Sequence, residues 1–292
     1  LPNGNLVFGS ELKSLITHGE ISKEVDYSAL DAYLTFGYVP EEFCIFQGVE
    51  KLAPGHFLIF KNGKIKTEQF WDFKYDEISE VKTEEEYAIE LREKIKDAVK
   101  VRLISEVPLG AFLSGGVDSS AIVGFMTEIL DKPVKTFSIG FNEDTFSELK
   151  YARITAKHFN TEHHEFVVTP DLVETIDELV WHFDEPFSDP SSMPTFMVSK
   201  MARDYVTVVL SGDGGDELFA GYTRYLIDQK RSGLGSLPNA VRKGLMQPIS
   251  EALPHGTRGK NFLYNTSLDA IDRYIDSVSQ FGRLKKSSLY SE

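Results

Sequence analysis

The chain has 292 residues, of which 41% are hydrophobic and 26% are charged, a composition that excludes a fibrous or disordered protein. Its 31 Lys and Arg residues against 45 Asp and Glu residues give a formal charge of −14. That charge repels phosphate backbones and anionic membrane surfaces, so we expect neither nucleic acid nor a membrane as a partner. The length allows about two domains.

Cys44 is the only cysteine, which excludes an internal disulfide and a cysteine-based zinc cage. We expect it to be a small buried side chain in a reducing compartment, and we expect the protein to be cytoplasmic. No segment approaches the roughly 18 apolar residues of a membrane span. The first residues, Leu1-Pro2-Asn3, include neither a Met nor a signal sequence, so we expect a processed or recombinant piece of a longer protein.

Residues 1–72 are predicted to be rich in β-structure. Short apolar runs lie at 6–8 and 57–60, and Lys61-Asn62-Gly63-Lys64 is typical of a hairpin turn between strands at 57–60 and 64–69. Residues 74–86 are polar and acidic and are predicted to be a linker. Thr83 and Glu86 have the spacing of a capping box, so we expect a helix to start there.

From residue 107 onward, short apolar runs alternate with helical patterns. We expect strands over 107–113, 135–141, 164–168 and 206–210, and helices over 119–130, 147–159, 171–183 and 191–205. This alternation predicts an α/β fold, a parallel sheet with helices on both faces. Ligands bind such sheets at the carboxyl ends of the strands. Residues 222–292 are predicted to be helical.

The segment that follows the first of these strands, Leu113–Ser120, reads LSGGVDSS. Gly115 and Gly116 let the backbone turn sharply and approach a ligand with no Cβ in the way. The segment leads into a helix N-terminus, whose unpaired N–H groups and dipole favour an anion. Hydroxyl donors are added by three serines, Ser114, Ser119 and Ser120. We therefore predict a phosphate site.

Asp118 is the unusual member of this segment, because a carboxylate repels phosphate unless a cation bridges them. Mg²⁺ meets this need, since it binds few carboxylates and completes its shell with phosphate oxygens and water. The segment matches neither the Walker A pattern nor G-x-G-x-x-G. The alternative is a tight strand–helix turn in which Asp118 and Ser119 only cap the helix.

A second glycine-rich, acidic segment, Ser211–Tyr222, follows the strand at 206–210 and reads SGDGGDELFAGY. It should leave the sheet at the same edge as the first segment. Its acids, among them Asp213 and Asp216, would repel one another unless they face a cation or a cationic substrate group. Capping of the following helix is the alternative for Asp216.

Ser114–Ser119 resembles the SGGxDS loop of ATP pyrophosphatases, which cleave ATP between the α and β phosphates and transfer AMP to an oxygen. Residues 210–225, LSGDGGDELFAGYTRY, resemble the signature of glutamine-dependent asparagine synthetases. Three shorter segments carry the same resemblance: Phe8–Leu15, Ala53–His56 and Asp184–Ser191. By this resemblance, 1–72 is the carboxyl-terminal part of a glutaminase domain, and 73–292 is a synthetase domain truncated at its C-terminus.

The resemblance also implies the roles of individual residues. Adenine would contact the backbone of Leu113 and Ile139. Pyrophosphate would lie in a cradle formed by Ser114, Gly115, Gly116 and Ser119. Ser211 and Gly212 would contact the nucleotide, Asp118 and Asp216 would hold Mg²⁺, and Asp213 would act in forming the β-aspartyl-AMP intermediate. In the best-known branch of the family, the position of Asp213 is Glu.

Two departures from the family pattern concern the ends of the chain. The family's glutaminase depends on an amino-terminal cysteine, whereas residue 1 here is Leu. A lysine that contacts pyrophosphate in the family lies beyond residue 292. We therefore expect this stretch alone not to hydrolyse glutamine, to bind ATP weakly and to complete the reaction poorly.

The resulting hypothesis is an ATP-dependent asparagine synthase that takes aspartate and glutamine-derived ammonia, with a homodimer left open. One alternative is the same chemistry on another carboxylate, as in polysaccharide or antibiotic biosynthesis. The other is a nucleotide-binding module without turnover. Asp184, Glu185 and Asp189 either cap helices or, with Ser191, bind the amino acid, and the sequence leaves both roles open.

Overall fold

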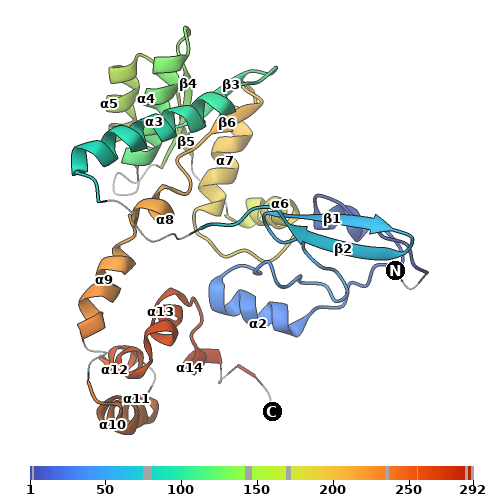
Figure 1. Ribbon diagram of the computed structural model, residues 1–292, viewed down its shortest axis with the longest axis vertical. Helices are drawn as coiled ribbons and strands as arrows, with labels where there is room; N and C mark the ends of the chain where they lie inside the picture. Colours follow the sequence, from blue (N-terminus) through green and yellow to red (C-terminus); the bar gives the residue numbers. More distant parts are fainter. Residues whose placement is uncertain are drawn as a thin grey trace. The chain divides into compact units, whose positions relative to one another are not determined.

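A computed structural model describes residues 1, 3–74, 81–141, 147–168, 172–233, 237–254, 256–286 and 289–290 (Figure 1). The chain forms two compact units. Unit 1 consists of Leu1–Asp72, Val180–Asp189 and Ala220–Glu292, and unit 2 consists of Phe73–Leu179 and Pro190–Phe219. Among the described residues, no helix has the length and apolar character needed to cross a bilayer.

Unit 2 is built on a parallel sheet of four strands in the order β5-β4-β3-β6. The strands are β3 (Leu109–Phe112), β4 (Lys135–Phe141), β5 (Glu162–Val168) and β6 (Val208–Leu210). The predicted fold class is confirmed, and β4 has the predicted bounds. The chain moves from β3 to β4 and β5 on one side and returns to β6 on the other, so the order reverses between β3 and β6. In parallel sheets, such a reversal is where ligands bind.

Helices cover both faces of this sheet, as Figure 1 shows. Alternate residues of β3 point to opposite faces because the side-chain period of a strand is two. Ala111 packs in a core with residues of α3 (Glu84–Arg102), α4 (Val117–Ile129) and α5 (Leu149–Phe159). Phe112 packs on the other face, in a core with Phe137 and residues of α7 (Ser192–Ala202). Both layers are needed because each face of the sheet is apolar.

The helix α3 starts where the sequence predicts. The Thr83 hydroxyl accepts a hydrogen bond from the Glu86 N–H, and the Glu86 carboxylate accepts one from the Thr83 N–H, so the capping box is complete. The helix α4 starts at Val117, two residues before the prediction, because Gly116 is already its N-cap. The helix α6 covers Leu172–Phe183, and its last four residues belong to unit 1.

The predicted hairpin is confirmed in the N-terminal segment of unit 1. Strand β1 (His56–Lys61) pairs antiparallel with β2 (Lys64–Gln69), and Lys61 lies opposite Lys64. Asn62 and Gly63 form the two-residue turn with φ values of 53° and 72°, which suits the twist of a hairpin.

Two helices in this segment were not predicted, namely α1 (Leu12–Leu15) and α2 (Tyr27–Phe36). The carboxylate of Asp26 caps α2 by accepting the N–H groups of Ser28 and Ala29. Gly37 ends α2 with a φ of 83°, a left-handed conformation that favours glycine. The run at 6–8 forms no strand in the described structure.

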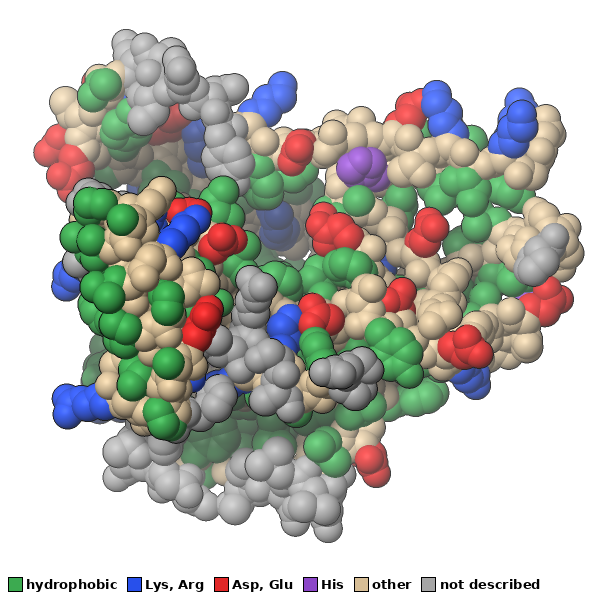
Figure 2. All heavy atoms as spheres, turned by 90° about the horizontal axis from the view of Figure 1, so that it is seen from below, with side chains coloured by type: hydrophobic (Ala, Val, Ile, Leu, Met, Phe, Trp, Pro, Cys, Tyr) green, Lys and Arg blue, Asp and Glu red, His purple; other side chains and the backbone are tan. Residues whose placement is uncertain are grey.

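The C-terminal segment of unit 1 is helical, as predicted. Its helices are α9 (Thr223–Ser232), α10 (Asn239–Val241), η2 (Arg242–Met246), α11 (Gln247–Ala252), α12 (Lys260–Ser267), α13 (Ala270–Val278) and α14 (Arg283–Lys286). Arg242 is buried and donates to the carbonyl of Leu268 at 2.7 Å, which ties η2 to the end of α12. On the face shown in Figure 2, acidic, basic and apolar side chains are interspersed.

Candidate functional site

A cavity of about 330 Å³ lies in unit 2 at the carboxyl ends of β3, β4 and β6. Nine of the predicted site residues line it: Leu113, Ser114, Gly116, Asp118, Ser119, Ile139, Ser211, Gly212 and Asp213. Apart from Ile139 on β4, they come from two segments almost 100 residues apart in the sequence, brought together because β6 pairs directly with β3. The predicted convergence of the two glycine-rich segments at one edge of the sheet is therefore present.

The first segment turns at Gly115, whose φ is 87°. A Cβ at this position would lie 2.4 Å from the backbone nitrogen of Ala152 in α5, so both the conformation and the space require glycine. The Ser114 and Ser119 hydroxyls lie 2.9 Å apart, and the Gly116 N–H donates to the Ser114 hydroxyl at 3.2 Å. These bonds fix the turn at the N-terminus of α4, and a helix N-terminus favours an anion.

The second segment packs directly against the first. A Cβ on Gly212 would lie 2.7 Å from the backbone nitrogen of Ser119. A Cβ on Gly215, the first residue of α8 (Gly215–Phe219), would lie 2.5 Å from the carboxyl carbon of Asp118. The two glycines thus permit an approach that no other residue allows, and the Asp118 side chain lies against the residue that precedes Asp216.

The acids of the site differ in their partners. Asp213 is exposed and accepts a hydrogen bond from the Ser211 hydroxyl at 2.8 Å. Asp118 and Asp216 are half-buried, and neither carboxylate has a hydrogen-bond or ion-pair partner among the described residues. Half-buried carboxylates without a protein partner are the donors that a divalent cation takes up. Each of the two carboxylates is therefore available to a cation.

Across the described part of the chain, no group of three or more His, Cys, Asp or Glu side chains is arranged to hold a metal ion. A cation at Asp118 and Asp216 would accordingly depend on phosphate oxygens and water for the rest of its shell. This is the coordination that Mg²⁺ adopts with nucleotides.

The adenine side of the cavity is constrained by hydrogen bonds already made. The Leu113 N–H donates to the carbonyl of Phe137 at 2.9 Å, so it is not available to a ligand. The Leu113 carbonyl accepts the Ser138 hydroxyl, which leaves one lone pair for a ligand. Ile139 lines the cavity on the neighbouring strand β4. An adenine in this place would meet the Leu113 carbonyl and not its N–H.

The remaining predicted residues lie outside the cavity lining. The Ser120 hydroxyl is 3.1 Å from that of Thr155 in α5, so it ties two helices together. Gly115 forms the turn and lies against α5, and Asp216 follows Gly215, which lies against the Asp118 side chain. Asp189 belongs to unit 1 and Ser191 to unit 2, where it precedes α7.

The sequence analysis missed an apolar wall of the cavity and one acid in its lining, Glu148. The wall is formed by Phe112, Phe137, Leu149, Ala152, Pro194 and Val198, and the polar additions are Ser138, Glu148 and Thr195. Phe112 and Phe137 could have been found, because each precedes a predicted site residue on a parallel strand. The contribution of α7 depends on tertiary packing and has no local signal.

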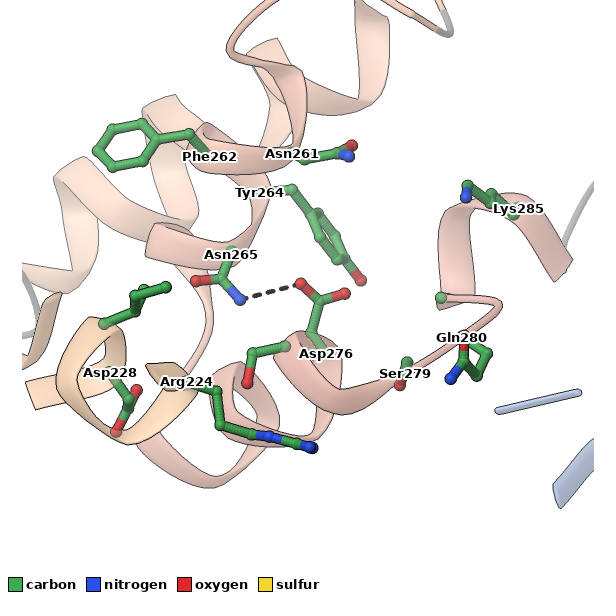
Figure 3. A pocket seen from close by; sticks show the side chains of 13 residues that line it. Arg224, Asp228, Asn261, Phe262, Tyr264, Asn265, Asp276, Ser279, Gln280 and Lys285 are labelled. Atoms are coloured by element: carbon green, nitrogen blue, oxygen red, sulfur yellow. Dashed lines mark hydrogen bonds between the residues drawn. The ribbon is translucent and has the colours of Figure 1, made fainter. Parts of the chain in front are cut away.

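A second cavity, of about 350 Å³, lies in unit 1 among α9, α12, α13 and α14 (Figure 3). It contains none of the predicted residues, and most of its charged groups already have protein partners. Asp228 pairs with Arg273 at 3.1 Å, and Asp276 accepts a hydrogen bond from Asn265 at 3.0 Å, drawn as a dashed line in Figure 3. The Arg224 guanidinium lies over the ring of Tyr222 at 4.3 Å. The candidate nucleotide site is therefore the cavity in unit 2.

Comparison with known proteins identifies the family of the chain. The model of the asparagine synthase family matches residues 90–287, and that of the glutamine amidotransferase domain matches residues 1–71. The chain is 37% identical to asparagine synthetase [glutamine-hydrolyzing] 1 of Bacillus subtilis, over 98% of this chain and 45% of that protein.

Two further relatives are similar to a comparable degree. A putative asparagine synthetase [glutamine-hydrolyzing] 2 of Methanocaldococcus jannaschii is 39% identical over 86% of this chain and 50% of its own length. A putative asparagine synthetase [glutamine-hydrolyzing] of Mycobacterium bovis is 35% identical over 95% of this chain and 43% of its own length. The chain thus spans about half the length of these relatives. Since the family model covers more than half of the chain and its motifs line one cavity, the chain belongs to the asparagine synthase family.

Proposed function

We propose that the chain is part of a glutamine-hydrolysing asparagine synthase, an ATP-dependent ligase that forms an amide from the side chain of aspartate. The observation that carries this proposal is the contact between the two acidic segments, in which Asp118 lies against Gly215 beside Asp216. A nucleotide-binding module without turnover would not need the acids Asp118 and Asp216. The relatives' names agree with this function.

In this proposal, ATP lies along the cavity with its phosphates at the N-terminus of α4. Ser114, Gly116 and Ser119 would bind the pyrophosphate through hydroxyl and N–H groups, which supply positive potential in a chain of net charge −14. Ser211 and Gly212 would contact the nucleotide from the second segment. The adenine would lie between Ile139 and the apolar wall, with the Leu113 carbonyl accepting from its amino group.

Asp118 and Asp216 would hold Mg²⁺, which when bound would neutralise phosphate charge and stabilise the departing pyrophosphate. The residues fit such an ion because both carboxylates lack a protein partner in the described structure, and the Asp118 carboxylate lies against Gly215, the residue before Asp216.

The chemistry explains why ATP is needed. The aspartate side-chain carboxylate is a poor electrophile because its charge repels a nucleophile and its leaving group would be oxide. Attack of this carboxylate on the α-phosphorus of ATP releases pyrophosphate and gives a β-aspartyl-AMP. Ammonia then attacks the acyl carbon, AMP leaves and asparagine forms. Asp213, exposed at the cavity and held by Ser211, would face the reacting carboxyl group during both steps.

We further propose a division of the chain near residue 72. Residues 1–72 would be the carboxyl-terminal part of a glutaminase domain that supplies ammonia from glutamine, and 73–292 would be synthetase. The two family matches, at 1–71 and 90–287, support this division. Asp189 and Ser191, next to the start of α7, would contact the acceptor amino acid. The single buried cysteine is in keeping with a cytoplasmic enzyme.

The direct test is the exchange of labelled pyrophosphate into ATP with aspartate present. We expect exchange that requires both Mg²⁺ and aspartate, because adenylation is reversible and releases pyrophosphate. Formation of ADP and phosphate in place of AMP and pyrophosphate would contradict the proposal.

One residue favours a second candidate, namely the same adenylation on another carboxylate. Asp213 is one methylene shorter than the Glu of the best-known branch of the family, which leaves more room beside the reacting group. Exchange assays with a panel of carboxylic acids would separate the two. Exchange faster with another acid than with aspartate would favour the second candidate.

A further inference from the structure

The cavity among α9, α12, α13 and α14 of unit 1 has no place in the proposed reaction. Its volume of about 350 Å³ is in the range of small-molecule sites, which is roughly 300–1,000 Å³. It shares no lining residue with the nucleotide cavity of unit 2. Four charged side chains line it: Arg224, Asp228, Asp276 and Lys285. What it can bind depends on which of these charges the protein itself has neutralised.

The two acids of this cavity differ in their counter-charges. The Asp228 carboxylate pairs with the Arg273 guanidinium at 3.1 Å, and the Arg273 side chain is only 7% exposed, so this pair is structural. Asp276 is half-buried, and its carboxylate accepts a hydrogen bond from the Asn265 amide at 3.0 Å. That donor is neutral, and no cationic side chain among the described residues forms an ion pair with Asp276. The negative charge of Asp276 is therefore not compensated within the described part of the chain.

The position of Asp276 in its helix makes this charge more costly. Asp276 lies in the last turn of α13, which contains no basic residue. The C-terminal end of a helix carries a partial negative charge, so a carboxylate there is disfavoured. A cationic ligand would relieve both effects. Since no group of three or more His, Cys, Asp or Glu side chains in the described structure is arranged to hold a metal ion, an organic ammonium group fits this place better than a metal.

The two cations of the cavity lie against aromatic rings. The Arg224 guanidinium is 4.3 Å from the centre of the Tyr222 ring, and the Lys285 ammonium is 5.5 Å from that of Phe281. Such ring contacts orient a cation without neutralising its charge. The N–H groups of a stacked guanidinium lie in its own plane, so they remain able to bind a carboxylate. The cavity thus presents two positive charges and, at Asp276, one negative charge.

These groups come from different sides of the cavity. In Figure 3, Asp276 lies beside Tyr264, and Lys285 and Gln280 lie across the cavity from them. Arg224 extends along another side, from α9. A small molecule bound at Asp276 would therefore lie in a space that both cations border.

We propose that this cavity binds an acidic α-amino acid, with its ammonium group at Asp276 and its two carboxylates at Arg224 and Lys285. Such a ligand carries one positive and two negative charges, the complement of the charges in the lining. Ile227 and Phe262 add apolar surface for its methylene groups. The site goes beyond the proposed function, because the adenylation reaction is assigned to the cavity of unit 2 and uses none of these residues.

Asp276→Asn separates binding from folding. The asparagine removes the charge but keeps an oxygen that can accept from Asn265, so we expect the affinity for the amino acid to fall at least about tenfold. The midpoint of urea unfolding should stay the same or rise, because the charge at the end of α13 is gone. Arg224→Met and Lys285→Met should each weaken binding as well. Asp272→Asn, on the same helix but outside the lining of this cavity, is the control and should bind like wild type.

The closing experiment is calorimetry without nucleotide, in which aspartate, glutamate, succinate and asparagine are added to the full chain. We expect aspartate or glutamate to bind at least about tenfold more tightly than succinate, which lacks the ammonium group, and than asparagine, which lacks the second carboxylate.

Nuclear magnetic resonance then locates the binding. The side-chain amide signals of Asn261 and Gln280, which line the cavity, should shift in wild type and not in Asp276→Asn. Unshifted amide signals, equal affinity for succinate, or unchanged affinity in Asp276→Asn would overturn the site. A lack of aspartate-dependent pyrophosphate exchange would contradict the proposed function alone, because exchange reports on the cavity of unit 2.

Discussion

Asp118 and Asp216, the acids of the two glycine-rich segments, make an instructive comparison with Asp184 and Glu185 of unit 1. Asp118 and Asp216 are half-buried beside glycines and have no protein partner in the described part of the chain. Asp184 and Glu185 are also largely buried, but backbone N–H groups and lysine side chains bind both carboxylates. In our proposal the first pair receives a cation from outside the chain, whereas the second pair already has its partners within the chain.

This difference follows from the cost of burying charge. A buried carboxylate without hydrogen bonds or a counter-ion is unfavourable, so a protein keeps one only where something else is to bind. The glycines are part of the same arrangement, since Gly212 and Gly215 let backbone approach the Asp118 side chain. At Asp184 and Glu185, lysine side chains and N–H groups surround the acids instead. The hydrogen-bond and ion-pair partners of a buried acid therefore distinguish a ligand-binding role from a structural one, which the residue type alone does not.

The largest effect is expected from closing the space beside Asp118. In Gly215→Ala the new Cβ would lie 2.5 Å from the Asp118 carboxyl carbon, so the second segment must move away from the first. We expect the affinity for ATP with Mg²⁺, measured by calorimetry, to fall about a hundredfold. Gly19→Ala, where no atom lies within 4 Å of the added Cβ, is the control. Wild-type affinity in Gly215→Ala would show that the close contact between the two segments is not needed for ATP binding.

A smaller effect is expected on the free energy of unfolding, which should fall when a paired acid is changed and stay the same when an unpaired acid is changed. Glu185→Gln keeps the shape but loses the charge that faces Lys51 and weakens the acceptor for Ile45. The free energy of unfolding should fall by about 2 kcal/mol in urea titration. Asp118→Asn removes a carboxylate with no described partner, so its unfolding free energy should stay within about 0.5 kcal/mol of wild type. A larger loss of unfolding free energy in Asp118→Asn than in Glu185→Gln would contradict the view that Asp118 is unpaired and Glu185 is structural.

A third prediction extends the comparison to Asp31, another paired acid of unit 1. Lys286 and Tyr290 both donate to its carboxylate, which lowers the pKa of Asp31 and raises the pKa of Tyr290 from 10.0 to about 12. The Asp31 contribution to stability is complete above its ordinary pKa of 3.8 and is lost as the pH falls through the lowered pKa. The Tyr290 contribution is complete below pH 10.0 and is lost as the pH rises through about 12.

The phenolate absorbance of Tyr290 measures this directly. The absorbance difference between wild type and Tyr290→Phe should develop near pH 12. In Asp31→Asn the pKa of Tyr290 should return toward 10.0, because the charge that opposes ionisation is gone. Titration of Tyr290 near 10.0 in wild type would show that the Asp31 contact does not form.

The sequence predicts the parts of the molecule that depend on neighbours along the chain. The capping box at Thr83, the turn at Asn62-Gly63 and the bounds of β4 all follow from local patterns and are confirmed. The convergence of two loops at one edge could also be predicted, because the direction of parallel strands fixes which ends meet.

Other features depend on contacts between distant segments and have no local pattern. Asp184 accepts the N–H of Leu12, 172 residues away, so the sequence cannot tell its structural role from substrate binding. The Ser120 hydroxyl looks like a phosphate donor in its motif but faces Thr155 in the next helix. The helix α2 was missed although Asp26 and Gly37 mark its ends, because its neighbours indicated β-structure. The contribution of α7 to the cavity follows only from packing on the sheet.

The measurement that tests the central claim most directly is a double-mutant cycle on magnesium-dependent ATP binding. Calorimetry would compare wild type, Asp118→Asn, Asp216→Asn and the double variant, each with Mg²⁺ and with chelator. We predict that wild type binds ATP at least about tenfold more tightly with Mg²⁺, that either single variant loses this gain, and that the double variant loses no more. Equal affinity with and without Mg²⁺ in wild type, or losses that simply add, would show that the two carboxylates do not hold one ion.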